Sequence, residues 1–154
     1  MELTRLLGYC GGSFAVGFVS GLVPAVNTEA YLLALVALAP SAAVAPAVLF
    51  VTAGQMLAKA LLYLAGSGAL QSRFLKAPEG RLAAVRRRLE RMQRGASAVL
   101  FSSALTGIPP FYVVSVAASS LRVSLARFLL VGSSGRLLRF AAIVALPGLL
   151  GASR

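Results

Sequence analysis

The sequence predicts an all-α integral membrane protein, built as an inverted repeat of a re-entrant helical hairpin followed by a transmembrane helix. Three observations predict this fold. The chain is 58% hydrophobic and 12% charged, whereas soluble domains average about 45–50% and about 25%. Four long apolar regions follow one another along the chain. Two of them are continuous, and the other two are interrupted by proline and glycine.

The first apolar region, residues 6–38, is interrupted by the polar stretch 24–29. Its second part, residues 30–38, is too short to cross a hydrocarbon core of about 30 Å. Short apolar pieces beside proline are typical of a segment that enters the bilayer and leaves on the same side. We expect a re-entrant hairpin with its tip at Pro24. An ordinary span over residues 6–23 followed by a loop is the alternative.

The second and fourth regions, residues 47–66 and 128–150, are continuous. At 1.5 Å of rise per residue each is roughly 30 Å long, so each predicts one transmembrane helix. The third region, residues 96–121, is interrupted at 107–110. It predicts a second re-entrant hairpin, with Pro109 and Pro110 at its tip.

The stretch between the two halves, residues 71–94, is the most polar part of the chain and carries eight Lys or Arg. Its apolar residues follow a 3–4–3 spacing that lines one helix face: Leu82, Val85, Leu89 and Met92. The pattern predicts a basic amphipathic helix lying on the bilayer surface, with a solvated linker as the alternative. The positive-inside rule makes this segment cytoplasmic.

The chain is thus predicted to be one membrane domain with three consecutive parts. Residues 1–69 form the first hairpin and span, residues 70–95 the interfacial segment, and residues 96–154 the second hairpin and span. Hairpin and span then recur with opposite orientation, as in many secondary transporters. A shift of 81 residues aligns Gly54 with Gly135 and places Gln55 opposite Arg136.

Ionisable side chains inside the predicted spans are the candidate functional residues, because charges at such depth are rare and usually mark a site. Arg136 and Arg139 are three residues apart, so they share one helix face. Gln55, Lys59 and Tyr63 recur every four residues and form another polar face. For Arg136 and Lys59, an alternative is that the side chain extends to the bilayer surface.

Glu29 is the only acid in the apolar regions. Asn27 or Thr28 can cap a helix that begins near it. The carboxylate then pairs with Arg136 or Arg139, or binds a proton; serving only the helix terminus is the alternative. The candidate substrate- or ion-binding residues are therefore Asn27, Glu29, Gln55, Lys59, Arg136 and Arg139, with Pro24, Pro109 and Pro110 at the hairpin tips.

The chain has no histidine and one cysteine, Cys10. A Cys–His pair or a His-centred triad is therefore excluded, and so is a Cys/His metal cluster. We expect no catalytic residue, no metal and no cofactor. The net charge of +11 suits attraction to anionic lipid better than nucleic-acid binding, because little of the chain is available as a soluble scaffold.

Short motifs recur along nearly the whole chain: Pro24 and Glu29, Gly54, Tyr63 and Gly66, Phe101, Pro109 and Pro110, Ala117 and Ala118, Phe128, and Gly135 with Arg136. These motifs resemble those of the DedA/VTT family, also called SNARE-associated Golgi protein-like membrane proteins. Many members carry two arginines and an acidic or amide residue where this chain has Ser103, Tyr112 and Lys59, so it resembles a short, divergent member.

The resemblance implies a flippase or scramblase of phosphate-bearing lipids, such as undecaprenyl phosphate or phospholipids, in a bacterial plasma (inner) membrane. A proton is a candidate coupling ion, and anionic lipid head groups are the expected partners. The alternative function is a non-transporting scaffold or assembly factor, in which the basic helix recruits a partner. A membrane enzyme ranks last.

Overall fold

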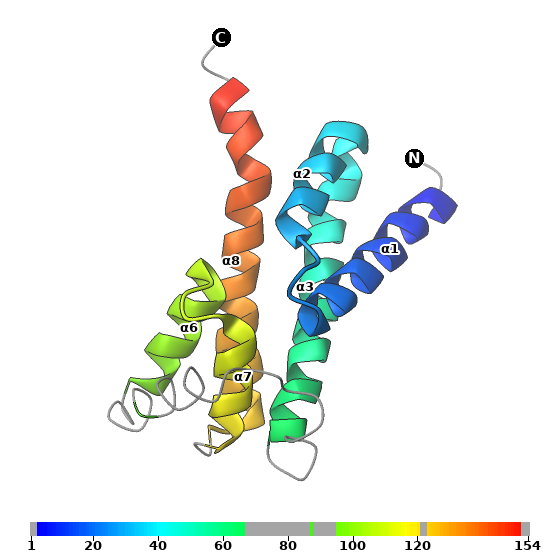
Figure 1. The fold of residues 1–154 in the computed structure, drawn as a ribbon. Coiled ribbons are helices and arrows are strands. Elements are labelled where there is room, and N and C mark those ends of the chain that lie inside the picture. The colour runs from blue at the N-terminus through cyan, green and yellow to red at the C-terminus, as the bar shows by residue number, and fades with distance from the viewer. Residues whose placement is uncertain (1–2, 67–86, 88–94, 121–122, 152–154) are drawn as a thin grey trace. The chain divides into compact units, whose positions relative to one another are not determined.

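The computed structural model describes residues 3–66, 87, 95–120 and 123–151, which form helices and no strands (Figure 1). The all-helical prediction is therefore confirmed for this part of the chain. The predicted interfacial segment, residues 70–95, lies outside the described residues except for Gly95 and the exposed Arg87. The helices are α1 (Leu3–Leu22), α2 (Thr28–Leu38), α3 (Ser41–Gly66), α6 (Ala96–Thr106), α7 (Phe111–Ser120) and α8 (Leu125–Gly151).

Both predicted interruptions of the apolar regions are present. The first separates α1 from α2, and Pro24 lies in the turn, where its missing N–H prevents the helix from continuing. The second separates α6 from α7. Gly107 has a left-handed φ of 82° and donates its N–H to Ser103 O at 2.8 Å. Glycine adopts this conformation without steric cost, so it ends α6.

Two helices, α3 and α8, are long and apolar enough over Ser41–Ala65 and Leu125–Gly148 to cross a membrane. This confirms the two predicted membrane-length helices, although both begin earlier than expected. We predicted α3 from residue 47, after Pro46, but the helix starts at Ser41 and continues through that proline. We predicted α8 from Phe128, but it starts at Leu125, where Ser124 Oγ accepts a hydrogen bond from Arg127 N.

The chain divides into two compact units, and the division falls inside both α3 and α8. The first unit comprises residues 1–57 and 136–154. Its hydrophobic core joins α2, α3 and α8 through Leu32, Val48, Val51 and Phe140. Close van der Waals packing of such side chains favours helix association, including between helices that are surrounded by lipid.

Two glycines bring α1 and α3 of the first unit close together. A Cβ atom on Gly17 would collide with the backbone of Val51. A Cβ atom on Gly54 would collide with the backbone of Phe14 and Phe18. Small residues allow such close approach between helices.

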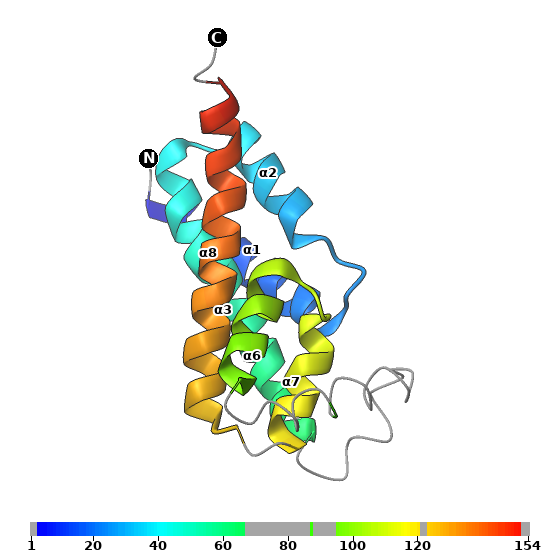
Figure 2. The ribbon, with the colours of Figure 1, turned by 90° about the vertical axis from the view of Figure 1, so that its left-hand side faces the viewer.

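The second unit, residues 58–135, contains the α6–α7 hairpin (Figures 1 and 2). The rings of Phe111 and Phe128 stack with their centroids 6.0 Å apart. The Tyr63 ring lies 5.2 Å from Phe128, and its hydroxyl donates to Val123 O. A Cβ atom on Gly135 would come within 2.7 Å of Ala104 Cβ and 3.0 Å of Phe101 O, so α8 approaches α6 closely.

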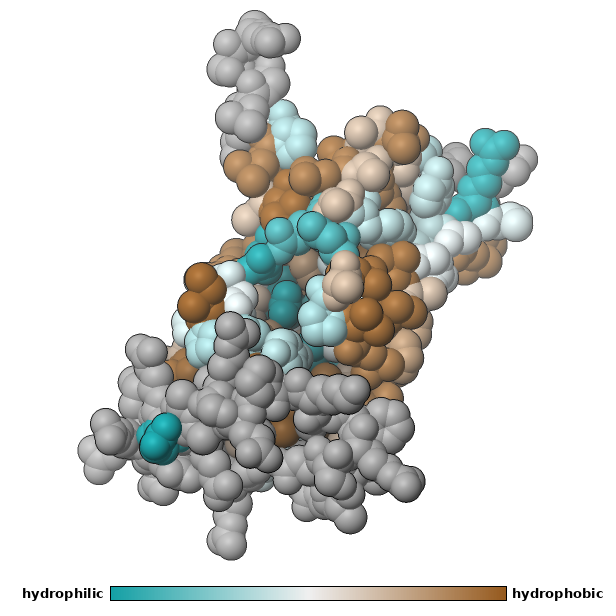
Figure 3. All heavy atoms as spheres, viewed as in Figure 1, coloured by the Kyte–Doolittle hydropathy of each residue, from teal (hydrophilic) through white to brown (hydrophobic). Residues whose placement is uncertain are grey.

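Large apolar side chains are exposed on several helices, as the brown surface in Figure 3 shows. Leu38 and Leu130 are 85% and 71% exposed. Extended apolar surfaces are unfavourable in water and mark contact with a partner or with lipid. The exposed leucines therefore agree with the two membrane-length helices.

Candidate functional site

The start of α2 is organised by Asn27. Its side-chain Oδ1 accepts hydrogen bonds from Glu29 N at 3.0 Å and from Ala30 N at 3.1 Å. Of the two predicted caps, Asn27 is therefore the N-cap, and its amide satisfies two backbone donors of the first turn. Asn27 thus orients Glu29, whereas Pro24 lies exposed in the preceding turn.

Glu29 and Arg139 form an ion pair within the first unit. Arg139 Nε donates to Glu29 Oε1 at 2.7 Å, and Arg139 Nη2 donates to the same oxygen. The Glu29 side chain is 39% exposed and that of Arg139 is 22% exposed. Hydrogen bonds between two charged groups are among the strongest that side chains make. Arg139 is therefore a direct partner of Glu29.

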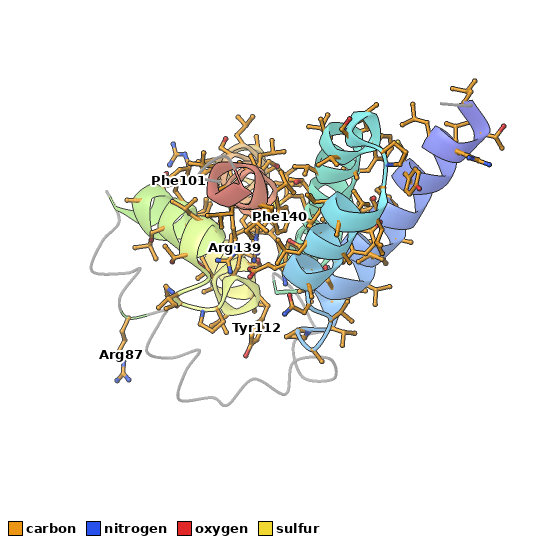
Figure 4. All side chains as sticks on the ribbon, turned by 90° about the horizontal axis from the view of Figure 1, so that it is seen from above. Arg87, Phe101, Tyr112, Arg139 and Phe140 are labelled. Carbon is orange, nitrogen blue, oxygen red and sulfur yellow. The ribbon has the colours of Figure 1, made fainter. Side chains whose placement is uncertain are left out.

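Arg139 lies well inside its helix. It follows Leu125, the first residue of α8, by 14 positions, which is roughly 21 Å along the helix axis. Figure 4 labels Arg139 next to the fully buried Phe140. A guanidinium at this position is far from either end of a helix of membrane length, so it needs a counter-charge such as Glu29.

Arg136 lies about one helical turn before Arg139 and is partly buried. The charges of both Arg139 and Glu29 act on it. Two cations therefore accompany one anion, and the cluster of Glu29, Arg136 and Arg139 carries one net positive charge. Arginine suits phosphate because its planar donors match two phosphate oxygens.

Gln55 connects three helices of the first unit. Its Nε2 donates to Ser20 Oγ in α1 and to Thr28 Oγ1 in α2, each at 2.9 Å. All three side chains are at least nine-tenths buried. Its Oε1 is also buried and has no hydrogen-bond partner among the described residues. Gln55 therefore ties the beginning of α2, one residue before Glu29, to α1 and α3.

Replacing Thr28 with valine should destabilise the protein by about 1–3 kcal/mol, because one buried N–H of Gln55 loses its acceptor. Thr52→Val is the matched control. Thr52 is equally buried but donates only to Val48 O of its own helix, at 2.7 Å. Melting temperatures of the two variants in detergent check this prediction. Equal melting temperatures would contradict the bridging role of Gln55.

Lys59 belongs to the second unit, whereas Glu29 and Arg139 belong to the first. It is 4% exposed, and its Nζ lies 5.9 Å from the centroid of the Tyr112 ring. A cation over an aromatic face at this distance is attracted by the ring quadrupole. The three residues of the predicted polar face of α3 therefore have partners in different units. Gln55 forms its hydrogen bonds within the first unit, whereas Lys59 and Tyr63 contact residues of the second unit.

Pro109 and Pro110 lie in the turn between α6 and α7, also in the second unit. The Ile108–Pro109 peptide bond is cis, and Ser103 Oγ donates to Pro109 O at 2.5 Å. Both prolines shape the backbone of this turn. Of the sequence-predicted residues, Pro24, Asn27, Glu29, Gln55, Arg136 and Arg139 thus belong to the first unit, and Lys59, Pro109 and Pro110 to the second.

No protein-family model matches the chain, and no curated protein or solved structure matches it either. The function therefore has to be argued from the site itself. Within the described residues, no group of three His, Cys, Asp or Glu side chains gathers as a metal site would require. The chemistry available in the first unit is recognition of charge by Glu29, Arg136 and Arg139.

Three contacts of these residues were not predicted from the sequence: Ser20 and Thr28 with Gln55, and Tyr112 with Lys59. Serine and threonine are common in apolar helices, so their presence alone carries no signal. A buried amide such as that of Gln55 does indicate that polar residues lie near it, because buried polar groups require hydrogen-bond partners. That requirement predicts that partners exist without saying which residues supply them.

Proposed function

We propose that this chain is an integral membrane protein that translocates phosphate-bearing lipids, as a flippase or scramblase. The observation that carries the proposal is the Glu29–Arg139 pair. It joins a short helix to the interior of a helix long enough to span a bilayer. Intramembrane charges that are kept despite their cost usually serve a substrate or an ion.

The lengths of α2 and α7 support two short helices that enter the membrane without crossing it. Helices α2 and α7 have 11 and 10 residues, about half of what a hydrocarbon core of roughly 30 Å requires. Non-helical turns at membrane depth are tolerated where protein or a wet cavity surrounds them. We propose that α2 and α7 each form part of a re-entrant hairpin; α1, with 20 residues, is by length alone able to cross.

The glycine contacts support the inverted repeat. Gly54 and Gly135, aligned by the 81-residue shift, each let a long helix approach the first helix of a hairpin. A Cβ atom on Gly54 would meet Phe14 O and Phe18 N of α1. A Cβ atom on Gly135 would meet Phe101 O and Leu105 N of α6. Each pair is four residues apart, as a carbonyl and its hydrogen-bonded amide are in a helix.

In this proposal the phosphate head group binds the guanidinium groups of Arg136 and Arg139 and displaces the carboxylate of Glu29. The lipid chains stay in the hydrocarbon, alongside exposed side chains of the first unit such as Leu38 and Leu138. A lipid can then change leaflets without its phosphate losing all polar contacts at mid-bilayer. Proton uptake by Glu29 is a candidate coupling step.

The remaining parts of the proposal rest on the motif resemblance and on the charge pattern of the sequence. They are membership of the DedA/VTT family, a bacterial inner membrane as the location, and residues 70–95 as a basic interfacial helix. Undecaprenyl phosphate and phospholipids are the candidate substrates, and no enzymatic step is required.

The test is transfer of a fluorescent phosphate-bearing lipid between leaflets of proteoliposomes containing the purified protein. Arg139→Gln should lower the rate about tenfold or more, because a charge-assisted hydrogen bond contributes about 1.5–3 kcal/mol. Arg127→Gln is the control, since Arg127 is exposed near the start of the same helix. Equal rates for the folded Arg139 variant and the wild type would refute the proposed site. If the wild-type protein transfers no lipid in liposomes, but Arg139→Gln still impairs its function in cells, the alternative function as a scaffold or assembly factor would be favoured.

A further inference from the structure

The charges of the first unit do not balance around Glu29. In the described part of this unit, residues 3–57 and 136–151, Glu29 is the only acid, whereas Arg136 and Arg139 lie within one turn of each other on α8. The one further charged side chain in that part is Arg5, which is exposed near the start of α1. The cluster of Glu29, Arg136 and Arg139 therefore carries one positive charge in excess, whichever arginine the carboxylate contacts.

The excess charge acts inside the cluster. Arg139 Nε donates to Glu29 Oε1 at 2.7 Å. On Arg136, the repulsion from Arg139 is larger than the attraction to Glu29. Both arginines are partly buried, so dissolved ions and water screen these charges incompletely. One negative charge brought to this site would offset the repulsion between the two guanidinium groups.

The charge of a bound head group decides whether the site is balanced. A phosphodiester has one acidic oxygen, so it brings one negative charge and leaves none in excess. A zwitterion with phosphate and ammonium groups brings no net charge, and its ammonium adds a third cation to the cluster. A phosphomonoester brings close to two negative charges at neutral pH. It therefore leaves one in excess unless a proton accompanies it, and uncompensated charge away from water is unfavourable.

We propose that the cluster of Glu29, Arg136 and Arg139 selects a lipid whose head group carries one negative charge on a phosphodiester, as in phosphatidylglycerol. The inference rests on the proposed lipid transfer and narrows its substrate class. The two guanidinium groups are then shared between two anions, the carboxylate of Glu29 and the phosphodiester. Every charge is compensated, and no proton has to accompany this head group.

The experiment measures the transfer of tail-labelled phosphatidylglycerol, phosphatidylcholine and phosphatidic acid by the full chain, in liposomes of one fixed composition at pH 8. Phosphatidylcholine supplies the zwitterion, and phosphatidic acid supplies the phosphomonoester with close to two negative charges. Phosphatidylglycerol should move about tenfold faster than either. An effect of this order is expected of one uncompensated charge at an effective dielectric constant of about 20.

The preference among lipids should follow the net charge of the cluster. Glu29→Gln leaves two positive charges and should shift the preference from phosphatidylglycerol toward phosphatidic acid. Arg136→Gln leaves no excess charge and should remove most of the preference for phosphatidylglycerol over phosphatidylcholine. Arg127→Gln is the matched control, because it removes a positive charge from an exposed position near the start of α8. It should leave the order of the three lipids unchanged.

The outcomes separate the two proposals. Equal rates for the three lipids, or phosphatidylcholine or phosphatidic acid moving fastest, would overturn the charge inference and leave lipid transfer standing. No transfer of any lipid would overturn both. The comparison among lipids uses the wild-type protein, so it remains decisive even where the cluster variants fail to fold.

Discussion

Reversing either charge of the Glu29–Arg139 pair is expected to disrupt the first unit, whereas reversing both charges should restore folding without restoring lipid transfer. Glu29→Arg and Arg139→Glu each place like charges where a hydrogen-bonded ion pair now stands. Removal of a partner from a fully buried pair costs about 3–5 kcal/mol. Because both side chains are partly exposed, we expect a loss of about 2–3 kcal/mol for each single variant.

The double variant E29R/R139E re-forms an ion pair between the same two helices. Its recovery should be incomplete by about 0.3–1 kcal/mol, since an arginine in the first turn of α2 opposes the helix dipole. Melting in detergent measures folding, and the proteoliposome assay measures transfer. A double variant that folds but transfers no lipid shows that the site needs a cation at position 139 of α8, in addition to Arg136. Full transfer by this variant would show that the pair has only a structural role.

The interruptions of the helices could be predicted from the sequence because their causes are local. Pro24 lacks an N–H, and Gly107 adopts a left-handed conformation that other residues rarely take. The start of α3 was predicted wrongly for a reason that is not local. The helix was expected from residue 47, where the apolar region begins, yet it starts at Ser41 and continues through Pro46, with Ala43 and Ala47 fully buried on either side. Packing offsets the hydrogen bond that the proline removes.

The candidate site was predictable by residue type but not by pairing. Their charge singled out Glu29, Arg136 and Arg139, because each is unusual in apolar sequence. Arg136 and Arg139 are three residues apart and share a helix face, so spacing alone allows either as the partner of Glu29. The contact of Arg139 with Glu29 depends on how α2 packs against α8, and it joins residues 110 positions apart. Tertiary packing of this kind leaves no local pattern.

A leucine at Gly54 and one at Gly135 should each open the packing of one unit and spare the other. Each leucine side chain would enter space that the backbone of a neighbouring helix occupies. At Gly54 this backbone belongs to Phe14 and Phe18, and at Gly135 it belongs to Phe101 and Leu105. Ordinary overpacking costs about 1–3 kcal/mol. Backbone neighbours yield less readily than side chains do, so we expect larger losses here. Gly12→Leu is the control, because nothing lies within 4 Å of its added Cβ.

Cys10 distinguishes the two effects, because it is the only cysteine and lies buried in α1 of the first unit. Gly54→Leu should separate α1 from α3 and accelerate alkylation of Cys10 by N-ethylmaleimide in detergent. Gly135→Leu should lower the melting temperature with little change in that rate. This pattern is what a repeat predicts, since matched glycines then perform the same packing role in separate halves. Equal acceleration by both variants would mean that the chain unfolds as one cooperative body, and the glycines would then be no evidence for two equivalent halves.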